Sequence, residues 1–218
     1  MKRLTTRALR VPSVLLAAGL ASCGIADAPQ HPAPITNVSQ FYFPLSDVGV
    51  SFAYCRATSI GTDTVRMTMN GRDQTTVDLS PDRRCYAVGI SNRDQFHSDL
   101  YFIVNDSEAA TVGSVSCGSG GATWLDLKSP LTEGQQWQFN TGNFYSPEVV
   151  TATVTRRGAQ MKMPAGQVFD DVTEVQYVTA ESDTTVKWFA RGVGLIYSSS
   201  TRPDTYFGSV MKYIGPVQ

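Results

Sequence analysis

The sequence predicts an all-β fold built from antiparallel sheets, and three observations support that prediction. Apolar and polar residues alternate over several stretches, as along Val150–Thr155, which is the pattern of half-buried strands. Turn-forming pairs such as Asn70-Gly71 and Arg157-Gly158 separate these stretches. No stretch after the first 22 residues shows the 3.6-residue apolar period of a helix. At about five or six residues per strand, we expect roughly a dozen strands.

The chain also contains an internal repeat. Residues 42–54 match 128–139, because each segment reads Pro-Leu, a polar pair, Gly and then aromatic-x-aromatic. Two further pairs of segments match in the same order, 64–71 with 151–158 and 101–104 with 188–191. The offset stays between 85 and 87 residues, which indicates an ancient duplication. Copies of about 85 residues are small for independent cores, so we expect two tandem copies in one continuous body.

The N-terminus has the features of a signal peptide. Four basic residues and no acidic one lie in residues 1–10, and the apolar stretch 11–21 is too short to span a bilayer. The motif Leu20-Ala21-Ser22-Cys23 resembles a bacterial lipobox. In proteins with that motif the chain is cut before the cysteine, whose thiol carries diacylglycerol and whose amino group often carries a further acyl chain such as palmitate. We therefore expect lipidation of Cys23; an ordinary signal peptide with a chance cysteine is the alternative.

These observations divide the chain into four predicted parts. They are the signal peptide 1–22, the lipidated cysteine with a proline-rich tether 23–37, the first β-rich copy 38–117 and the second copy 118–218. Several acyl chains would hold the protein stably to membrane lipid. Gly24 stands where Asp would resemble an inner-membrane retention signal. We therefore expect the cell envelope, with the outer membrane favoured and the domain facing the periplasm or the exterior.

Motifs in the second copy resemble a set of uncharacterised bacterial envelope lipoproteins. The motifs are Pro-Leu-x-x-Gly-x-x-Trp at 130–137, Pro-Ala-Gly at 164–166 ahead of Phe169, and Gly-Val-Gly-Leu at 192–195. The resemblance covers about 41–214 and implies an envelope location and this architecture, but no catalytic or binding residues. The chain departs from it at Phe52, where tryptophan is usual, and in one extra residue before Phe169.

The same motifs have physical interpretations. Pro164 and Gly166 suit a tight turn. Gly192 and Gly194 suit a bulge or a close approach of the backbone. We expect Trp137 and Trp188 to be core aromatics; a ligand-stacking role is the alternative.

Three cysteines follow Cys23 in the chain: Cys55, Cys85 and Cys117. An odd number allows at most one internal disulfide, for which Cys55–Cys85 is the predicted pair. Buried free thiols that act as small hydrophobic residues are an equal alternative. None of the three has metal-ligand spacing, so we expect no metal site.

The residues suited to catalysis are few. The histidines are His31 in the tether and His97, and no Gly-x-Ser-x-Gly motif occurs. Asp170-Asp171 with Glu174 could suggest glycosidase chemistry, but neighbouring strand residues point to opposite faces. We expect a solvated hairpin end there instead. The sequence thus predicts no catalytic residues, no cofactor and no enzyme.

Without residues 1–22, the chain has 14 basic and 19 acidic residues, so its net charge is about −5. We expect no nucleic-acid partner, because the sequence shows no basic stripe. The favoured function is a non-catalytic lipoprotein that binds an unknown envelope protein or supports an assembly. It predicts an exposed patch or an open sheet edge. The alternatives are a periplasmic carrier or chaperone for a hydrophobic ligand, which needs a large apolar cavity, and an enzyme based on His97 or clustered acids.

Overall fold

The computed structural model describes residues 32–42, 49–59, 61–72, 84–92, 95–113, 122–141, 148–204 and 208–217. Over these residues the all-β prediction is confirmed, since they form one short 3₁₀ helix and twelve strands. The elements are η1 Val38–Phe41, β1 Ser51–Thr58, β2 Gly61–Arg72, β3 Arg84–Asn92, β4 Gln95–Val104, β5 Glu108–Gly113, β6 Ala122–Lys128, β7 Gln136–Asn140, β8 Val149–Lys162, β9 Val168–Thr179, β10 Thr184–Ala190, β11 Gly194–Asp204 and β12 Gly208–Val217. No helix among the described residues is long and apolar enough to cross a membrane.

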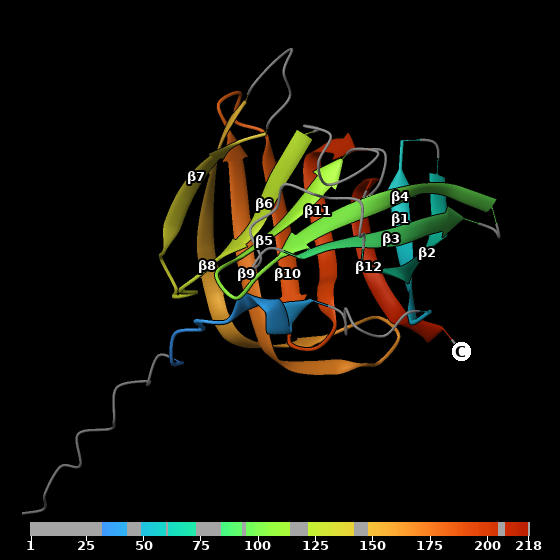
Figure 1. Ribbon diagram of the computed structural model, residues 1–218, viewed down its shortest axis with the longest axis horizontal. Coiled ribbons are helices and arrows are strands. Elements are labelled where there is room, and N and C mark those ends of the chain that lie inside the picture. Colours follow the sequence, from blue (N-terminus) through green and yellow to red (C-terminus); the bar gives the residue numbers. More distant parts are fainter. Residues whose placement is uncertain are drawn as a thin grey trace, which may run out of the picture. The chain divides into compact units, whose positions relative to one another are not determined.

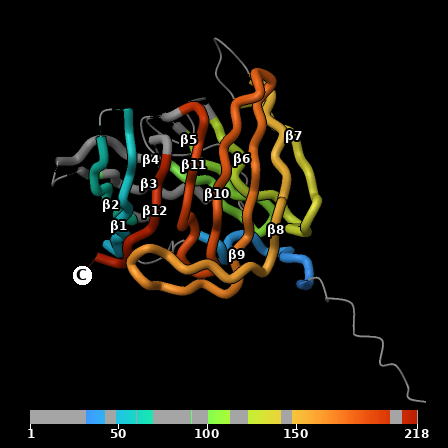
Figure 2. Tube along the Cα trace, turned by 180° about the vertical axis from the view of Figure 1, so that it is seen from behind, coloured from blue at the N-terminus to red at the C-terminus, as the bar shows by residue number. Residues whose placement is uncertain are grey.

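The twelve strands form one antiparallel sheet in the order β6-β5-β4-β3-β2-β1-β12-β11-β10-β9-β8-β7. Strands that are neighbours in sequence pair with one another, except β6 and β7, and β1 also pairs with β12. The sheet curls so that β3–β6 lie in front of β8–β11 (Figures 1 and 2). The two sheet ends are β6 and β7, although they follow one another in the chain.

The predicted inner faces of most strands are confirmed. Phe52 and Tyr54 of β1 are buried, and so are Trp137 of β7 and Val150 and Val154 of β8. One expectation is met only in part: Trp188 is partly buried and packs against the core without being one of its buried residues. It lies on the other face of β10 and stacks on Tyr197 at 4.3 Å between ring centroids. Its neighbours Lys187 and Phe189 face the core, at 4% and 1% exposure.

The two halves of the sheet share the same strand register. In β1–β2, Ser51 lies opposite Thr68, and 85 residues later Gln136 lies opposite Thr153 in β7–β8. The entry to each hairpin repeats as well. Gly49 N–H donates to the Met69 carbonyl at 2.8 Å, and Gly134 N–H donates to that of Val154 at 2.8 Å.

One irregularity of the ladders also corresponds. The β2–β3 register shifts between Met69 and Gly71, and the β8–β9 register shifts between Val154 and Arg156 at the same offset. A duplicated chain would show this agreement, because a bulge depends on local sequence and is inherited with it.

The N-terminal segment closes one end of the curled sheet. Val38 and Phe41 of η1 are fully buried, and Tyr42 is 5% exposed. Ile35 is also buried and exchanges two backbone hydrogen bonds with Leu131, at 3.2 and 2.8 Å. The predicted tether is therefore too long at its C-terminal side, because residues 32–37 already contact the folded body.

The hairpin between β8 and β9 closes the same end (Figures 1 and 2). Its predicted tight turn is confirmed, since Gly166 has φ +95° and donates to the Met163 carbonyl at 2.9 Å. Phe169 in the hairpin packs on Tyr213 of β12 at 5.8 Å. The predicted close approach at Gly192 is also present, because its N–H donates to the carbonyl of Gln40 in η1 at 2.8 Å.

Candidate functional site

An ion pair is buried in the core, between the two halves of the sheet. Lys187 Nζ on β10 lies 2.7 Å from Asp126 Oδ1 on β6, and both side chains are at most 5% exposed. The ammonium also lies over the rings of Trp124 and Tyr177, at 5.2 and 5.7 Å from their centroids. Such cation–π contacts partly replace the water that the lysine loses on burial.

A β-bulge directs Asp126 into this site. Ala109 and Ala110 of β5 lie opposite Leu127 and Leu125, which leaves Asp126 as the extra residue of β6. A bulge re-aims the side chain of its extra residue. Here it brings both the carboxylate and the backbone carbonyl of Asp126 inward, and that carbonyl accepts a hydrogen bond from the Tyr177 hydroxyl.

Two hydroxyl groups complete the hydrogen bonding of the carboxylate. Oδ2 of Asp126 accepts from Thr111 Oγ1 at 2.5 Å and from the Tyr42 hydroxyl at 3.2 Å. Burial raises the pKa of Tyr42 well above its usual value, and the nearby Asp126 charge raises it further. The same two causes raise the pKa of Tyr177. Both phenols therefore stay protonated at neutral pH and act as donors.

The buried site has no room for a substrate. The cavity beside Lys187 and Asp126 measures about 10 Å³, which is close to the minimum for one water molecule. The arrangement instead joins the two halves and, through Tyr42, the N-terminal segment. The sequence did not predict this ion pair, because the alternation along β10 is compatible with either face and Asp126 has no motif around it.

The predicted site residues are distributed as follows. Cys23, His31 and Cys117 lie outside the described residues, and for His97 in β4 and Cys85 in β3 only the backbone is described. Cys55 in β1 has a free thiol. No described group of three His, Cys, Asp or Glu residues could hold a metal ion.

The predicted Cys55–Cys85 disulfide is absent, and the register explains why. Cys55 lies opposite Thr64 of β2, whereas Cys85 lies one residue beyond Tyr86, which pairs with Arg72 at the other end of β2. At about 3.3 Å per residue, these positions are on the order of 25 Å apart along the sheet. A disulfide needs Cα atoms within about 7 Å.

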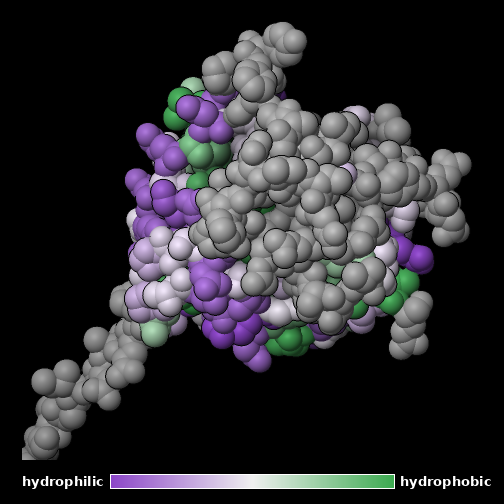
Figure 3. Space-filling model, viewed as in Figure 1, coloured by the Kyte–Doolittle hydropathy of each residue, from purple (hydrophilic) through white to green (hydrophobic). Residues whose placement is uncertain are grey.

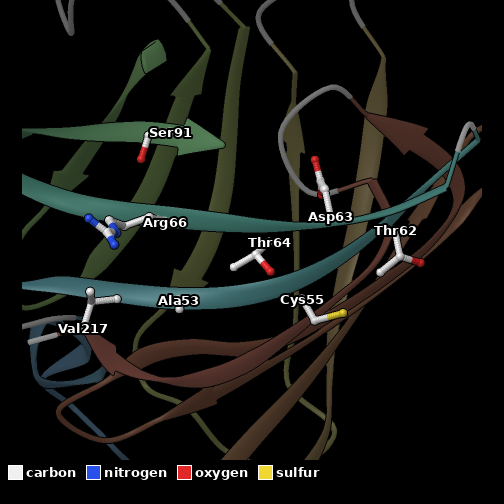
Figure 4. Close-up of a pocket in the computed structure, with 8 residues that line it drawn as sticks. All are labelled: Ala53, Cys55, Thr62, Asp63, Thr64, Arg66, Ser91 and Val217. Carbon is white, nitrogen blue, oxygen red and sulfur yellow. The ribbon is translucent and has the colours of Figure 1, made fainter. Parts of the chain in front are cut away.

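The Cys55 thiol lies in a shallow hollow of about 380 Å³ on the outer face of β1 and β2. Arg66 and Asp63 of β2 also line it. Figure 4 shows that the lining side chains are spread along the strands and do not converge on one point. The Asp63 carboxylate is paired with Arg56, at 2.6 Å. The hollow therefore lacks the focused polar groups of a catalytic site.

A second hollow, of about 490 Å³, lies where the N-terminal segment meets β8 and β9. Asp171 forms two ion pairs there, at 3.0 Å with Arg157 and 2.9 Å with Arg191. Asp170 instead accepts from Gln160 Nε2 at 2.7 Å. The two acids thus have separate partners, as expected from strand geometry. They are the third and fourth residues of β9, next to the β8–β9 turn, and Asp170 is exposed.

The sheet end at β7 presents unused backbone groups. On either side of β7, Thr141 N–H donates to the Glu148 carbonyl and the Gln135 carbonyl accepts from Val154 N–H. These bonds show that the odd-numbered residues are the ones that bond to β8. In an antiparallel ladder the residues between them face the other way. Gln136, Gln138 and Asn140 therefore direct their N–H and C=O groups away from β8, and their side chains are exposed.

Contacts between β7 and β6 at this opening are sparse. Thr123 N–H of β6 donates to the Thr141 carbonyl at 2.7 Å. Trp137 Nε1 donates to the Leu125 carbonyl of β6 at 3.4 Å. No ladder joins the two strands. Among the described residues, this opening, here called the β6–β7 seam, is linked by these two hydrogen bonds and by a ring contact between Trp124 and Phe139.

Comparisons with known proteins give two similar solved structures. No known protein family and no curated protein sequence matches the chain. A Bacteroides fragilis structure described as an exported protein with a YmcC-like fold has 12% identity and a TM-score of 0.49, over 82% of this chain and 100% of the other. A Parabacteroides distasonis structure described as a lipoprotein has 9% identity and a TM-score of 0.45, over 81% and 98%. Likeness at this level supports no statement about activity.

Proposed function

We propose that this protein is a non-catalytic bacterial envelope lipoprotein, anchored through acyl chains on Cys23, whose β domain binds an extended segment of another envelope protein. The observation that carries the proposal is the edge of β7, which no described strand covers. An exposed sheet edge accepts an added strand, because the backbone bonds of the ladder continue into the partner.

The closed part of the sheet supplies a template for this addition. β1 corresponds to β7 at the offset of 85 residues, and β1 is covered by β12. Along β12, Met211, Tyr213 and Gly215 are buried, whereas Lys212 and Ile214 are exposed. A partner strand on β7 would have the same alternation, with apolar residues on the inner face and polar residues outside.

The described surface offers no competing apolar patch. Large hydrophobic residues with substantial exposure are single valines and one isoleucine: Val149, Val168, Val178 and Ile214. Figure 3 shows the hydrophobic surface on the coloured part of this face as small separate areas. Backbone pairing at an edge therefore suits this surface better than a broad hydrophobic interface.

The carrier alternative receives no support from the described core. Aromatic and aliphatic side chains fill the interior, and the cavity at the buried ion pair is about 10 Å³. A hydrophobic ligand needs several hundred Å³ lined by apolar groups. The larger hollows described above are open and carry charged side chains.

Site-specific photocrosslinking in the native cell tests the proposal. A photoreactive amino acid replaces Gln138 on the β7 edge, and the control replaces Val178, which is similarly exposed but lies on β9 between β8 and β10. We expect a defined protein adduct from position 138 and none from 178. Adducts of equal yield from both positions would contradict edge binding.

Two substitutions separate backbone pairing from side-chain contact. Gln138→Pro removes the N–H that points outward, and proline is tolerated on an edge strand. Gln138→Ala removes the side chain and keeps the N–H. We expect the partner to be lost with Gln138→Pro and kept with Gln138→Ala. Loss with both variants would show recognition by the glutamine side chain instead.

The anchor is tested separately by metabolic labelling with a fatty-acid probe. We expect label on the wild-type chain and none on Cys23→Ser. Equal label on both chains would refute the lipidation of Cys23.

A further inference from the structure

We infer that the end of the domain closed by the N-terminal segment and the β8–β9 hairpin lies on the lipid headgroups, and that the opposite end points away from the membrane. The first end, called the basal end, comprises residues 32–36, 163–167 and 191–193. The opposite end, called the distal end, comprises the β9–β10 turn 180–183 and Glu148. This inference rests on the proposed lipidation of Cys23.

The N-terminal segment is fixed to the basal end by several contacts. Ile35 is buried and paired with Leu131. The Ala33 carbonyl accepts from Arg157 Nη2 at 3.4 Å, and Pro32 lies so close to Gly158 that an added Cβ there would be 3.1 Å from the proline ring. The chain therefore leaves the domain at Pro32, at the basal end.

The chain between Cys23 and Pro32 is short. Nine Cα–Cα steps reach at most about 32 Å when fully extended, and the root-mean-square span of a flexible chain of this length is on the order of 15–20 Å. β10, with seven residues between the distal turn 180–183 and the basal turn 191–193, runs on the order of 23 Å at roughly 3.3 Å per residue. An inverted domain would therefore need the tether to be close to full extension, whereas the basal orientation leaves it near its root-mean-square span.

The charge distribution agrees with this orientation. At the distal end, Glu148, Glu181 and Asp183 surround Arg202, with nearest oxygen–nitrogen distances of 3.6 to 4.0 Å, so three acids share one cation. At the basal end, exposed Pro164 and Ala165 form the hairpin turn, and Val168 beside it is 49% exposed. A bilayer with anionic lipid repels the acidic end and accepts small apolar residues at its surface.

Energy transfer from the protein to the membrane tests the inference. The full-length acylated protein, with Cys55, Cys85 and Cys117 changed to Ser, carries one fluorophore on either Ala165→Cys or Ala180→Cys. Both alanines are exposed, one at each end of the domain. The protein is reconstituted in vesicles of phosphatidylethanolamine and phosphatidylglycerol that contain an acceptor-labelled lipid.

We expect the transfer efficiency from position 165 to be at least about twice that from position 180, given ends on the order of 23 Å apart. Equal efficiencies, or a higher one from 180, would overturn the inference. A 20-residue Gly/Ser insertion between Ala28 and Pro29 should bring the two efficiencies together, and an unchanged ratio would refute the tether as the cause.

Failure of the anchor gives a different result from failure of the orientation. If Cys23 is not acylated, neither labelled chain associates with vesicles, and both efficiencies match those of the Cys23→Ser control. If Cys23 is acylated but the orientation is wrong, both chains bind and the ratio alone departs from the expected value.

Discussion

The two halves of the sheet have the same hairpin register and the same bulge, yet one junction between them is closed and the other is open. At the closed junction, Tyr54 of β1 meets Tyr213 of β12 edge to face at 5.6 Å. At the β6–β7 seam, Phe139 and Trp124 meet with nearly the same geometry at 5.5 Å. The aromatic packing is alike, but a ladder forms only between β1 and β12.

The connection between the strands explains the difference. β12 and β1 lie at opposite ends of the domain sequence, so no short connection restricts the register in which they pair. β6 and β7 are joined directly by residues 129–135, and within that link Leu131 pairs with Ile35 of the N-terminal segment. That pairing directs the backbone of the link toward the segment. Similar local sequences therefore give a closed or an open junction, depending on what else pairs with the connecting residues.

The largest expected effect comes from breaking the ion pair that joins the halves. Asp126→Ala removes the carboxylate that pairs with the buried Lys187 ammonium, and breaking a buried ion pair in this way costs about 3–5 kcal/mol in the free energy of unfolding. Chemical denaturation monitored by tryptophan fluorescence measures this loss. The double variant Asp126→Leu/Lys187→Met should recover much of it, since an apolar pair of similar volume needs no counter-ion. A double variant as unstable as the single one would show that the charges themselves are required.

Matched proline substitutions compare the two junctions directly. Ala53 and Gln138 are equivalent at the offset of 85 residues, but Ala53 lies opposite Gly215 of β12, whereas Gln138 lies on the open edge. We expect Ala53→Pro to lower the free energy of unfolding by on the order of 3 kcal/mol, through a lost ladder bond and steric conflict. Gln138→Pro should cost less than about 1 kcal/mol. Equal losses in thermal or urea unfolding would mean that β7 is paired.

The smallest expected effect concerns the indole that links β7 to β6. Trp137→Phe removes the hydrogen bond to the Leu125 carbonyl and should cost about 1 kcal/mol. Trp188→Phe is the matched control, because Trp188 Nε1 is buried without a hydrogen-bond partner. This second change should be nearly neutral or slightly stabilising. The same urea titration compares the two, and a larger loss for Trp188→Phe would contradict the assigned roles.

The sequence predicted the fold class and most inner faces well, because apolar alternation and burial have the same physical cause. Val150 and Val154 illustrate this, as both are fully buried. Lys187 illustrates the limit. Its burial depends on Asp126, 61 residues earlier in the chain, and on the bulge in β6, which no local sequence pattern predicts. Trp188 is only partly buried for a related reason. The ion pair of Lys187 with Asp126 fixes which face of β10 turns inward, and Trp188 lies on the other face.

The open edge could be predicted only in general terms. A binding protein with an exposed edge was expected, but the sheet opens between β6 and β7, where the connecting residue Leu131 pairs with Ile35. That contact joins a segment expected to be a tether to a loop between the two copies, and no spacing in the sequence indicates it. The cysteines show a similar limit. Their number and order in the sequence allowed a Cys55–Cys85 disulfide, but the β1–β2 and β2–β3 registers place the two residues too far apart.

Amide hydrogen exchange of the native protein, resolved by residue, tests the difference between the two junctions most directly. The amides of Ala53 and Gln138 occupy equivalent positions, one in the closed junction and one on the edge of β7. The account predicts strong protection at Ala53 and exchange orders of magnitude faster at Gln138, because a solvent-facing edge amide exchanges without unfolding. Equal protection of the two amides in the isolated protein would contradict an open β6–β7 seam.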